Sequence, residues 1–200
     1  MSSQSERSTL LDTWAETSAH VFDSMVAANR AAFAALGVEA TTDEEVPAER
    51  VEPAEDLPEW HAETTADAPE TVSVGDRFEF TKTITDDHVR SFAASNGDTH
   101  PLHLDDEFAE RTRFCGRIAH GTLVSGLISA ALARVPGLVI YLSQDLEFHN
   151  PVRIGDRITA DCEIVEDLGG GRLRLRTTVA KDDQQVIDGE AVVLIDEAPA

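Results

Sequence analysis

One short stretch of the chain concentrates side chains that can move protons. Within six positions lie the carboxylate of Asp98 and the imidazoles of His100 and His103, in a loop that also contains proline. If the loop curls around Pro101, Asp98 and His103 converge on one water molecule, remove one of its protons and deliver a proton elsewhere. The alternative is an Asx-type turn in which Asp98 caps backbone amides and His103 starts a helix. The spacing alone leaves both interpretations open.

A second chemical feature is the glycine that opens an apolar stretch. Gly121 follows His120 and precedes a largely apolar run that continues to Arg134. A glycine at a helix start lets a ligand approach the backbone, and the free N–H groups there favour negative charge. Directed at a carbonyl, such an N–H forms an oxyanion hole. An ordinary glycine at a helix start has the same sequence pattern.

The elements that must position these residues follow from hydrophobic periodicity. Thr85 is the expected N-cap of a helix over residues 85–94, and residues 120–134, apolar nearly all round, predict a buried helix. An extended segment precedes them, and an alternating pattern later predicts four strands over residues 138–148, 156–165, 172–180 and 185–195. One strand, then helices, then four strands indicates an α+β fold with an antiparallel sheet and a buried helix.

The chain divides into three segments of different composition. Residues 8–37 have apolar side chains at three- and four-residue spacing, which predicts an amphipathic helix. Residues 38–70 hold twelve acidic residues, four prolines and one basic residue, Arg50, which is typical of an extended linker with Trp60 as its one candidate anchor. The expected organisation is a helical extension at 1–37, an acidic linker at 38–70 and a compact domain at 71–196.

The composition limits the classes of partner. With 38 acidic and 16 basic residues among 200, the formal charge of −22 repels phosphate backbones and anionic headgroups, so we expect neither nucleic-acid nor membrane-surface binding. Cys115 and Cys162 are too few for a disulfide framework and lack metal-ligand spacing. With no apolar run of ~18 residues and no signal-peptide pattern, the expected location is the cytoplasm. Having only two lysines suits a salt-rich cytoplasm, although an acidic mesophilic protein is the alternative.

Three stretches together resemble a known family. The segments 92–103, 119–123 (Ala-His-Gly-Thr-Leu) and 145–156 (Asp-Leu-Glu-Phe-His-Asn-Pro-Val-Arg-Ile-Gly-Asp) resemble, in order and spacing, the MaoC-like dehydratases, which include the (R)-specific enoyl-CoA hydratases. The likeness covers residues 75–195. It implies a hot-dog fold, in which a curved antiparallel sheet wraps a central helix at 120–134. It also implies a homodimer or pseudo-dimer with acyl-CoA tunnels near the subunit interface.

The resemblance assigns roles to single residues. Asp98 and His103 match the family's catalytic pair, and Gly121 matches the glycine whose N–H polarises the thioester carbonyl. Ser129 matches a position that helps to order the site. The implied reaction is hydration of a trans-2-enoyl-CoA to an (R)-3-hydroxyacyl-CoA, without a metal or redox cofactor. The absence of Cys/His clusters and of Gly-rich dinucleotide loops agrees with that expectation.

The match departs from the family signature at His100, where the hydratases have asparagine. An imidazole partly replaces the amide as hydrogen-bond donor or acceptor, so positioning or substrate choice is in question there. His120 is expected to pack against the substrate channel. A hot-dog acyl-CoA thioesterase is the alternative enzyme, and the spacing of Asp98, His103 and Gly121 argues against it.

The N-terminal helix lies outside the hot-dog pattern. Its Ala-Asn-Arg-Ala-Ala-Phe run at 28–33, with Trp14 upstream, faintly resembles the phasins, which coat polyhydroxyalkanoate granules. The resemblance implies association with such granules, where an (R)-hydratase would feed polyester synthesis. The rival interpretation is a non-catalytic granule scaffold with a vestigial hot-dog domain.

Overall fold

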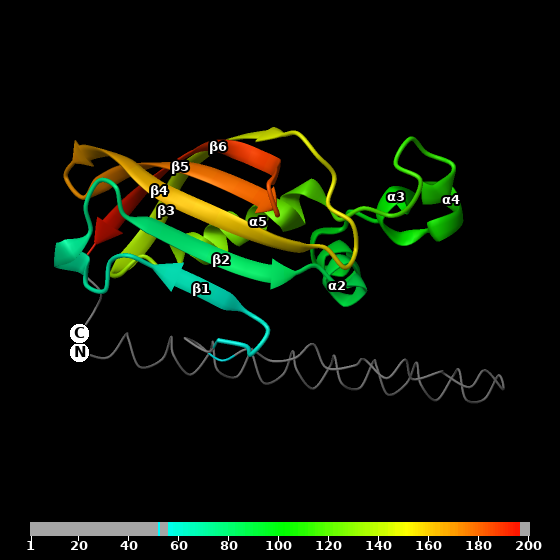
Figure 1. Cartoon of the computed structure of the whole chain (residues 1–200), viewed down its shortest axis with the longest axis horizontal. Coiled ribbons are helices and arrows are strands. Elements are labelled where there is room, and N and C mark those ends of the chain that lie inside the picture. The colour runs from blue at the N-terminus through cyan, green and yellow to red at the C-terminus, as the bar shows by residue number, and fades with distance from the viewer. Residues whose placement is uncertain (1–51, 53–55, 197–200) are drawn as a thin grey trace, which may run out of the picture. The chain divides into compact units, whose positions relative to one another are not determined.

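The computed structural model describes residues 52 and 56–196, which form one antiparallel sheet with its helices (Figure 1). The described residues belong to one compact unit that begins after Arg50, and the helix expected over 8–37 lies outside them. In chain order the elements are β1 (His61–Thr64), the 3-10 helix η1 (Pro69–Thr71), β2 (Arg77–Thr83), α2 (Asp86–Asn96), α3 (Pro101–Leu104), α4 (Asp106–Glu110), α5 (Gly121–Leu132), β3 (Leu138–Phe148), β4 (Arg157–Gly169), β5 (Arg172–Lys181) and β6 (Gln184–Asp196).

The six strands are ordered β1-β2-β4-β5-β6-β3, so that β1 and β3 form the two edges. Every neighbouring pair is antiparallel. The α5 helix packs on the face made by β2, β4 and β5, which is visible behind the strands in Figure 1. The predicted α+β class and the hot-dog arrangement of one sheet around a central helix are therefore confirmed.

Alternation along the strands separates the core from the outer surface. In β5 the side chains of Leu173, Leu175 and Val179 are buried, whereas Arg172 and Arg176 on the opposite face are exposed. Side chains of a strand point alternately to the two faces of a sheet, so one face can bury apolar groups against the helix. The four strands predicted after residue 137 are all present, with ends that differ by at most four residues.

Helix α5 presents its apolar face to the sheet. Val124, Leu127 and Ile128 are buried there, and the thiol of Cys162 on β4 points to the carbonyl of Ile128. The opposite face carries exposed small residues such as Gly126, which corrects the expectation of a helix buried all round. The reason is geometric, because a helix lying on one sheet buries only the stripe that faces the strands.

The compact domain begins earlier than residue 71. Strand β1 pairs with β2, with His61 opposite Thr81, inside the segment expected to be a linker. Just before β1, the Trp60 ring contacts the Phe80 ring edge-on at 5.6 Å, which confirms Trp60 as an anchor. All four β1 residues are exposed, so backbone pairing with the edge of β2 forms the strand without an apolar pattern that the sequence could reveal.

The loop between the two main helices contains further helical turns. Thr85 caps α2 as expected, its hydroxyl accepting a hydrogen bond from the amide of His88 at 3.3 Å. Short helices α3 and α4 then occupy part of the region expected to be a polar loop. None of the helices in the described residues has the length and apolar composition needed to cross a membrane.

Candidate active site

The imidazole of His103 is held in one orientation by the backbone. His103 lies on α3, and its Nδ1 is 2.8 Å from the carbonyl oxygen of Ile118. A carbonyl can only accept a hydrogen bond, so Nδ1 carries the proton and Nε2 is left with a free lone pair. Partial burial holds the pKa of His103 below its usual 6.5, because burial disfavours the charged ring. The side chain is therefore a neutral imidazole with a free basic nitrogen near neutral pH.

The turn before α3 brings Asp98 to this imidazole. The amide of Asp98 donates to the side chain of Asn96 at 2.9 Å, and its carboxylate accepts from the amide of His100 at 3.2 Å. The same carboxylate has a polar atom within 4.8 Å of ring nitrogens of both His103 and His120. The Asx-type turn of the alternative interpretation is therefore present, although His100 rather than His103 begins the helix, and the same turn leaves the Asp98 carboxylate near the His103 imidazole.

His120 lies beneath this pair in the core. Its side chain is 1% exposed, and its Nε2 is 3.0 Å from the carbonyl oxygen of Asp98, to which it donates. Its ring stacks on that of His103, with centroids 3.9 Å apart and an angle of 29° between the planes. The Nδ1 atom of His120 has no hydrogen-bond partner among the described residues. His120 thus joins the α5 start, the Asp98 backbone and the His103 ring, rather than lining a channel.

A cavity of about 290 Å³ opens beside these residues. His103 and Gly121 line it together with apolar side chains from α5 and β3, among them Val124 and Phe148. Gly121 is the first residue of α5, where backbone N–H groups lack intrahelical acceptors and carry the positive end of the helix dipole. The cavity therefore brings a neutral imidazole and a helix N-terminus to one mostly apolar space, an arrangement that suits a polarised carbonyl.

Two predicted site residues lie elsewhere. The Nδ1 of His100 caps α3 by accepting from the amide of Leu102 at 3.1 Å, and its ring is exposed. Ser129 is exposed on α5 and does not line the cavity. Eight residues advance a helix by about 12 Å and turn it by about 80°, so Ser129 lies well away from Gly121.

Several residues of the site carry no assigned role in the sequence-based account. Arg117 is mostly buried and pairs with Asp86 of α2 at 2.6 Å and Asp106 of α4 at 2.7 Å, which ties the helices around His103 together. Its pKa is raised, because hydrogen bonds and charge from these carboxylates outweigh the effect of burial. Phe148 belongs to the third family-like motif, but its contact with Gly121 depends on tertiary structure. Arg117 is not part of a sequence motif, so its ion pairs with two helices could not be predicted from the sequence.

Two groups in the described residues could in principle hold a cation. Asp98, His103 and His120 form one, and Glu147, His149 and Asp188 form the other, each with donor atoms within 4.8 Å of one another. In the first, the protonated nitrogens of both histidines are directed at backbone carbonyls. In the second, the His149 imidazole is paired directly with the carboxylate of Asp188. In both groups, therefore, some of the side-chain atoms that could bind a cation already form interactions within the protein.

The geometry agrees with comparisons to known proteins. A family model described as MaoC like domain matches residues 70–186, more than half of the chain. A 3-hydroxybutyryl-CoA dehydratase of Methylorubrum extorquens is 45% identical over 117 residues, which is 57% of this chain and 74% of that protein. An (R)-specific enoyl-CoA hydratase of Rhodospirillum rubrum is 39% identical over 129 residues, or 63% and 90% of the two chains.

A solved structure extends the agreement to three dimensions. The (R)-hydratase from A. caviae, described as involved in PHA biosynthesis, superimposes with a TM-score of 0.61 and 34% identity, over 64% of this chain and 99% of that one. Sequence motifs, a central helix on an antiparallel sheet and the family model thus agree over the same residues. The chain belongs to the MaoC-like domain family.

Proposed function

We propose that the protein hydrates trans-2-enoyl-CoA thioesters reversibly to (R)-3-hydroxyacyl-CoA. Family membership makes the chain an enzyme of the hydro-lyase type. The finer proposal is supported by the Asp98 carboxylate, which lies within 4.8 Å of the His103 imidazole, and by the cavity that His103 and Gly121 line together. One group can accept a proton from water, the other can orient that water, and the helix start can stabilise a developing negative charge.

In the proposed mechanism, the proton that is taken from water is the one that is later given to the substrate. His103 Nε2 removes a proton from a water molecule that Asp98 holds, while the water oxygen bonds to C3 of the enoyl group. The alkene electrons move to C2 and onto the thioester oxygen, where the Gly121 N–H and the dipole of α5 stabilise the charge. The imidazolium then returns its proton to C2. The net change is addition of H and OH across the double bond, with no metal ion or redox cofactor in the proposal.

The decisive experiment incubates the protein with crotonyl-CoA and measures the enoyl-thioester absorbance and the free thiol in the same sample. Loss of the enoyl-thioester absorbance without release of free thiol, and with (R)-3-hydroxybutyryl-CoA as product, is the expected result. Release of thiol would instead assign the protein to the hot-dog thioesterases. Silence in both signals, repeated with longer and branched enoyl-CoAs, would favour the scaffold alternative. A reaction without substrate corrects for the exposed thiol of Cys115.

The proposed working form is a homodimer. Strand β3 is an edge strand, and apolar side chains along it are 40–56% exposed in the single chain: Leu138, Ile140, Tyr141, Leu142 and Phe148. An exposed apolar edge strand invites pairing with a second chain. Analytical ultracentrifugation should give twice the chain mass, and Tyr141→Lys should shift the protein toward the monomer.

The proposed cellular role is supply of (R)-3-hydroxyacyl-CoA for polyhydroxyalkanoate, with the protein held at the granule by its N-terminal segment. Its support is the phasin-like run at 28–33 and the PHA-linked relative of similar structure. Because Trp60 and β1 belong to the domain, removal of residues 1–50 is the appropriate truncation. Equal recovery of full-length and truncated protein with isolated granules would refute the tether.

A further inference from the structure

Two arginines beside the cavity have no carboxylate partner among the residues that the structure describes. The chain has 38 acidic and 16 basic residues, and seven of the described basic residues form ion pairs with carboxylates. Within the described residues, neither Arg113 nor Arg153 has such a partner. Unpaired guanidinium groups on so acidic a surface are available to an external anion.

The two guanidinium groups meet at Phe114. The Arg113 Cζ lies 4.9 Å from the centre of the Phe114 ring, and Arg153 donates a hydrogen bond to the carbonyl oxygen of Phe114. Stacking and hydrogen bonding restrict both side chains, which lowers the entropy lost on binding a ligand. The local structure thus holds two positive charges at one short loop.

The backbone fixes Arg153 against the same loop. Arg153 forms an isolated antiparallel bridge with Ile118, the residue whose carbonyl orients His103. Gly116 has a φ of +140°, and a Cβ atom there would lie 3.0 Å from Arg153 Nη1. A glycine is therefore required for the chain to turn under the guanidinium.

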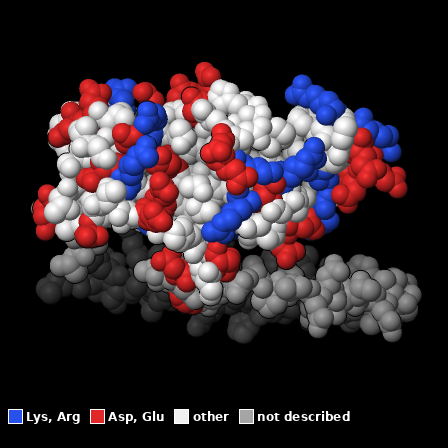
Figure 2. Space-filling model, viewed as in Figure 1, with Lys and Arg blue, Asp and Glu red and all other residues white. Residues whose placement is uncertain are grey.

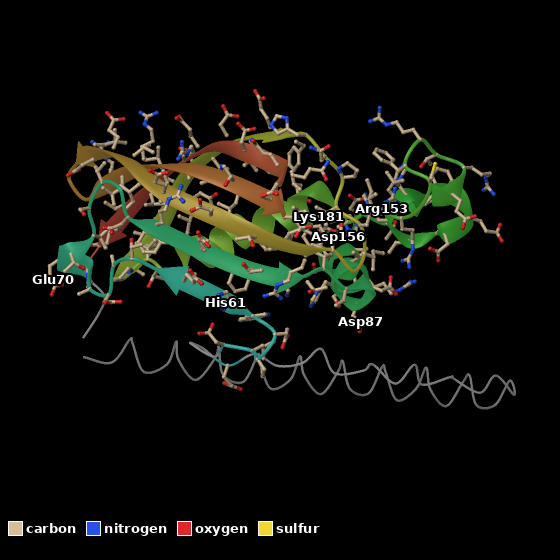
Figure 3. All side chains as sticks on the ribbon, in the orientation of Figure 1. His61, Glu70, Asp87, Arg153, Asp156 and Lys181 are labelled. Atoms are coloured by element: carbon tan, nitrogen blue, oxygen red, sulfur yellow. The ribbon has the colours of Figure 1, made fainter. Side chains whose placement is uncertain are left out.

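One arginine lines the cavity, and Arg153 directly follows Val152, another lining residue. Arg113 and Phe114 line the cavity that also contains His103 and Gly121. Figure 3 shows Arg153 between the end of the sheet and the segment of α3 and α4. In Figure 2, Lys and Arg side chains gather at that end of the molecule, although acidic side chains surround them.

We propose that Arg113 and Arg153 bind the diphosphate of coenzyme A. The inference rests on the proposed function, since an acyl thioester whose carbonyl reaches Gly121 extends its pantetheine arm out of the cavity. Guanidinium groups pair strongly with phosphate oxygens, and two of them match two linked phosphates. The net charge of −22 otherwise repels a polyanionic carrier, so local positive charge is required for its capture. The pair of arginines thereby selects the carrier rather than the acyl group.

A series of three crotonyl thioesters tests whether Arg113 and Arg153 bind the diphosphate. Crotonyl-CoA carries the diphosphate, crotonyl-phosphopantetheine one phosphate and crotonyl-pantetheine none. Arg113→Gln and Arg153→Gln should each raise KM for crotonyl-CoA about tenfold, with kcat nearly unchanged. KM for crotonyl-pantetheine should not change, because that substrate lacks the group that the arginines hold. An equal rise in KM for all three thioesters would overturn the proposal, as would no rise for crotonyl-CoA.

The control variant is Arg174→Gln, which removes the same charge from an arginine paired with Glu166 at 2.9 Å. Its KM for crotonyl-CoA should match that of the wild type. If KM values of the wild type for crotonyl-CoA and crotonyl-phosphopantetheine are equal, one phosphate suffices and the diphosphate assignment is wrong.

Calorimetric titration of each full-length protein with coenzyme A itself separates this inference from the proposed function. Weaker binding in both arginine variants, but not in Arg174→Gln, supports the site even if crotonyl-CoA is not hydrated. Equal binding in all proteins overturns it even if hydration is confirmed.

Discussion

The imidazole of His103 stacks on that of His120 at a centroid distance of 3.9 Å. Burial, the largest contribution, holds the pKa of His103 below 6.5; the hydrogen bond to Ile118 opposes this shift, and the neighbouring His120 imidazole adds a smaller lowering effect. The neutral, basic form of His103 therefore persists to a more acidic pH than in a free histidine. The buried His120 ring therefore helps to keep the cavity-lining His103 ring in its basic form.

The pH dependence of kcat/KM should reflect that lowered pKa. The base is active when neutral, so kcat/KM should fall as the pH is lowered, with the midpoint of this fall below pH 6.5. The contribution of His103 to the free energy of unfolding should also decrease as the pH falls below 6.5. The reason is that His103 binds a proton more readily in the unfolded chain than in the folded one. The control is His88→Gln, since His88 also has a pKa lowered by burial but does not line the cavity. If the midpoint of the fall in kcat/KM moved in His88→Gln, the fall would not be caused by protonation of His103 in the cavity.

Removal of either proposed proton-handling group should stop catalysis and leave the fold intact. Asp98→Asn and His103→Gln should each lower kcat at least ~10²-fold, which is the usual contribution of a positioned acid or base. Asp98 is exposed and His103 half-buried, so circular dichroism and the melting temperature should change little. Turnover near the wild-type rate in either variant, measured with crotonyl-CoA, would disprove the assignment.

Gly121 should tolerate no side chain if substrates approach its amide. A Cβ atom there would lie 2.9 Å from Cε1 of Phe148, whose ring is 56% exposed and can move aside. Gly121→Ala should therefore fold but lose kcat/KM, because the methyl group and the displaced ring occupy the path to the N–H.

Gly126→Ala is the matched control on the same helix. A Cβ atom at Gly126 has no heavy atom within 4 Å, and alanine is the better helix former by about 1 kcal/mol. Thermal unfolding should show a more stable protein with unchanged kcat/KM. Equal losses of activity in Gly121→Ala and Gly126→Ala would mean that the helix, rather than the amide, is sensitive.

The two cysteines should differ sharply in reactivity. Cys115 is exposed, whereas burial raises the pKa of the Cys162 thiol to about 12. The thiolate is the reactive form, so a disulfide reagent at pH 8 should label one thiol per folded chain and two in denaturant. Cys115→Ser should remove labelling of the folded protein, and labelling that persists would mean that β4 opens readily.

Salt should stabilise the folded protein. The formal charge is −22, and raising KCl from about 0.1 M to about 1 M shortens the Debye length from about 10 Å to about 3 Å. Screening of carboxylate repulsion should raise the melting temperature, and NaCl at equal ionic strength should act alike. A melting temperature that falls or stays constant would contradict adaptation to a salt-rich cytoplasm.

The sequence by itself determined the order of the two longer helices and the four later strands, and the types of side chain in the site. Strand alternation, the Thr85 cap and the apolar run after Gly121 are local patterns, and local patterns set secondary structure. The spacing of Asp98 and His103 likewise placed these two side chains near each other, since the intervening turn is short, but their role as an acid–base pair came from the family resemblance. Strand β1 escaped detection because backbone pairing with β2, rather than its own side chains, forms it.

Tertiary structure alone decided which groups surround that pair. The Ile118 carbonyl that fixes the His103 tautomer is 15 residues away, and the His120 side chain that holds the Asp98 carbonyl is 22 residues away. Phe148 reaches Gly121 only because β3 returns beside the start of α5. Likewise, Ser129 is exposed and does not line the cavity. Such contacts depend on how elements pack, and no spacing within one element encodes them.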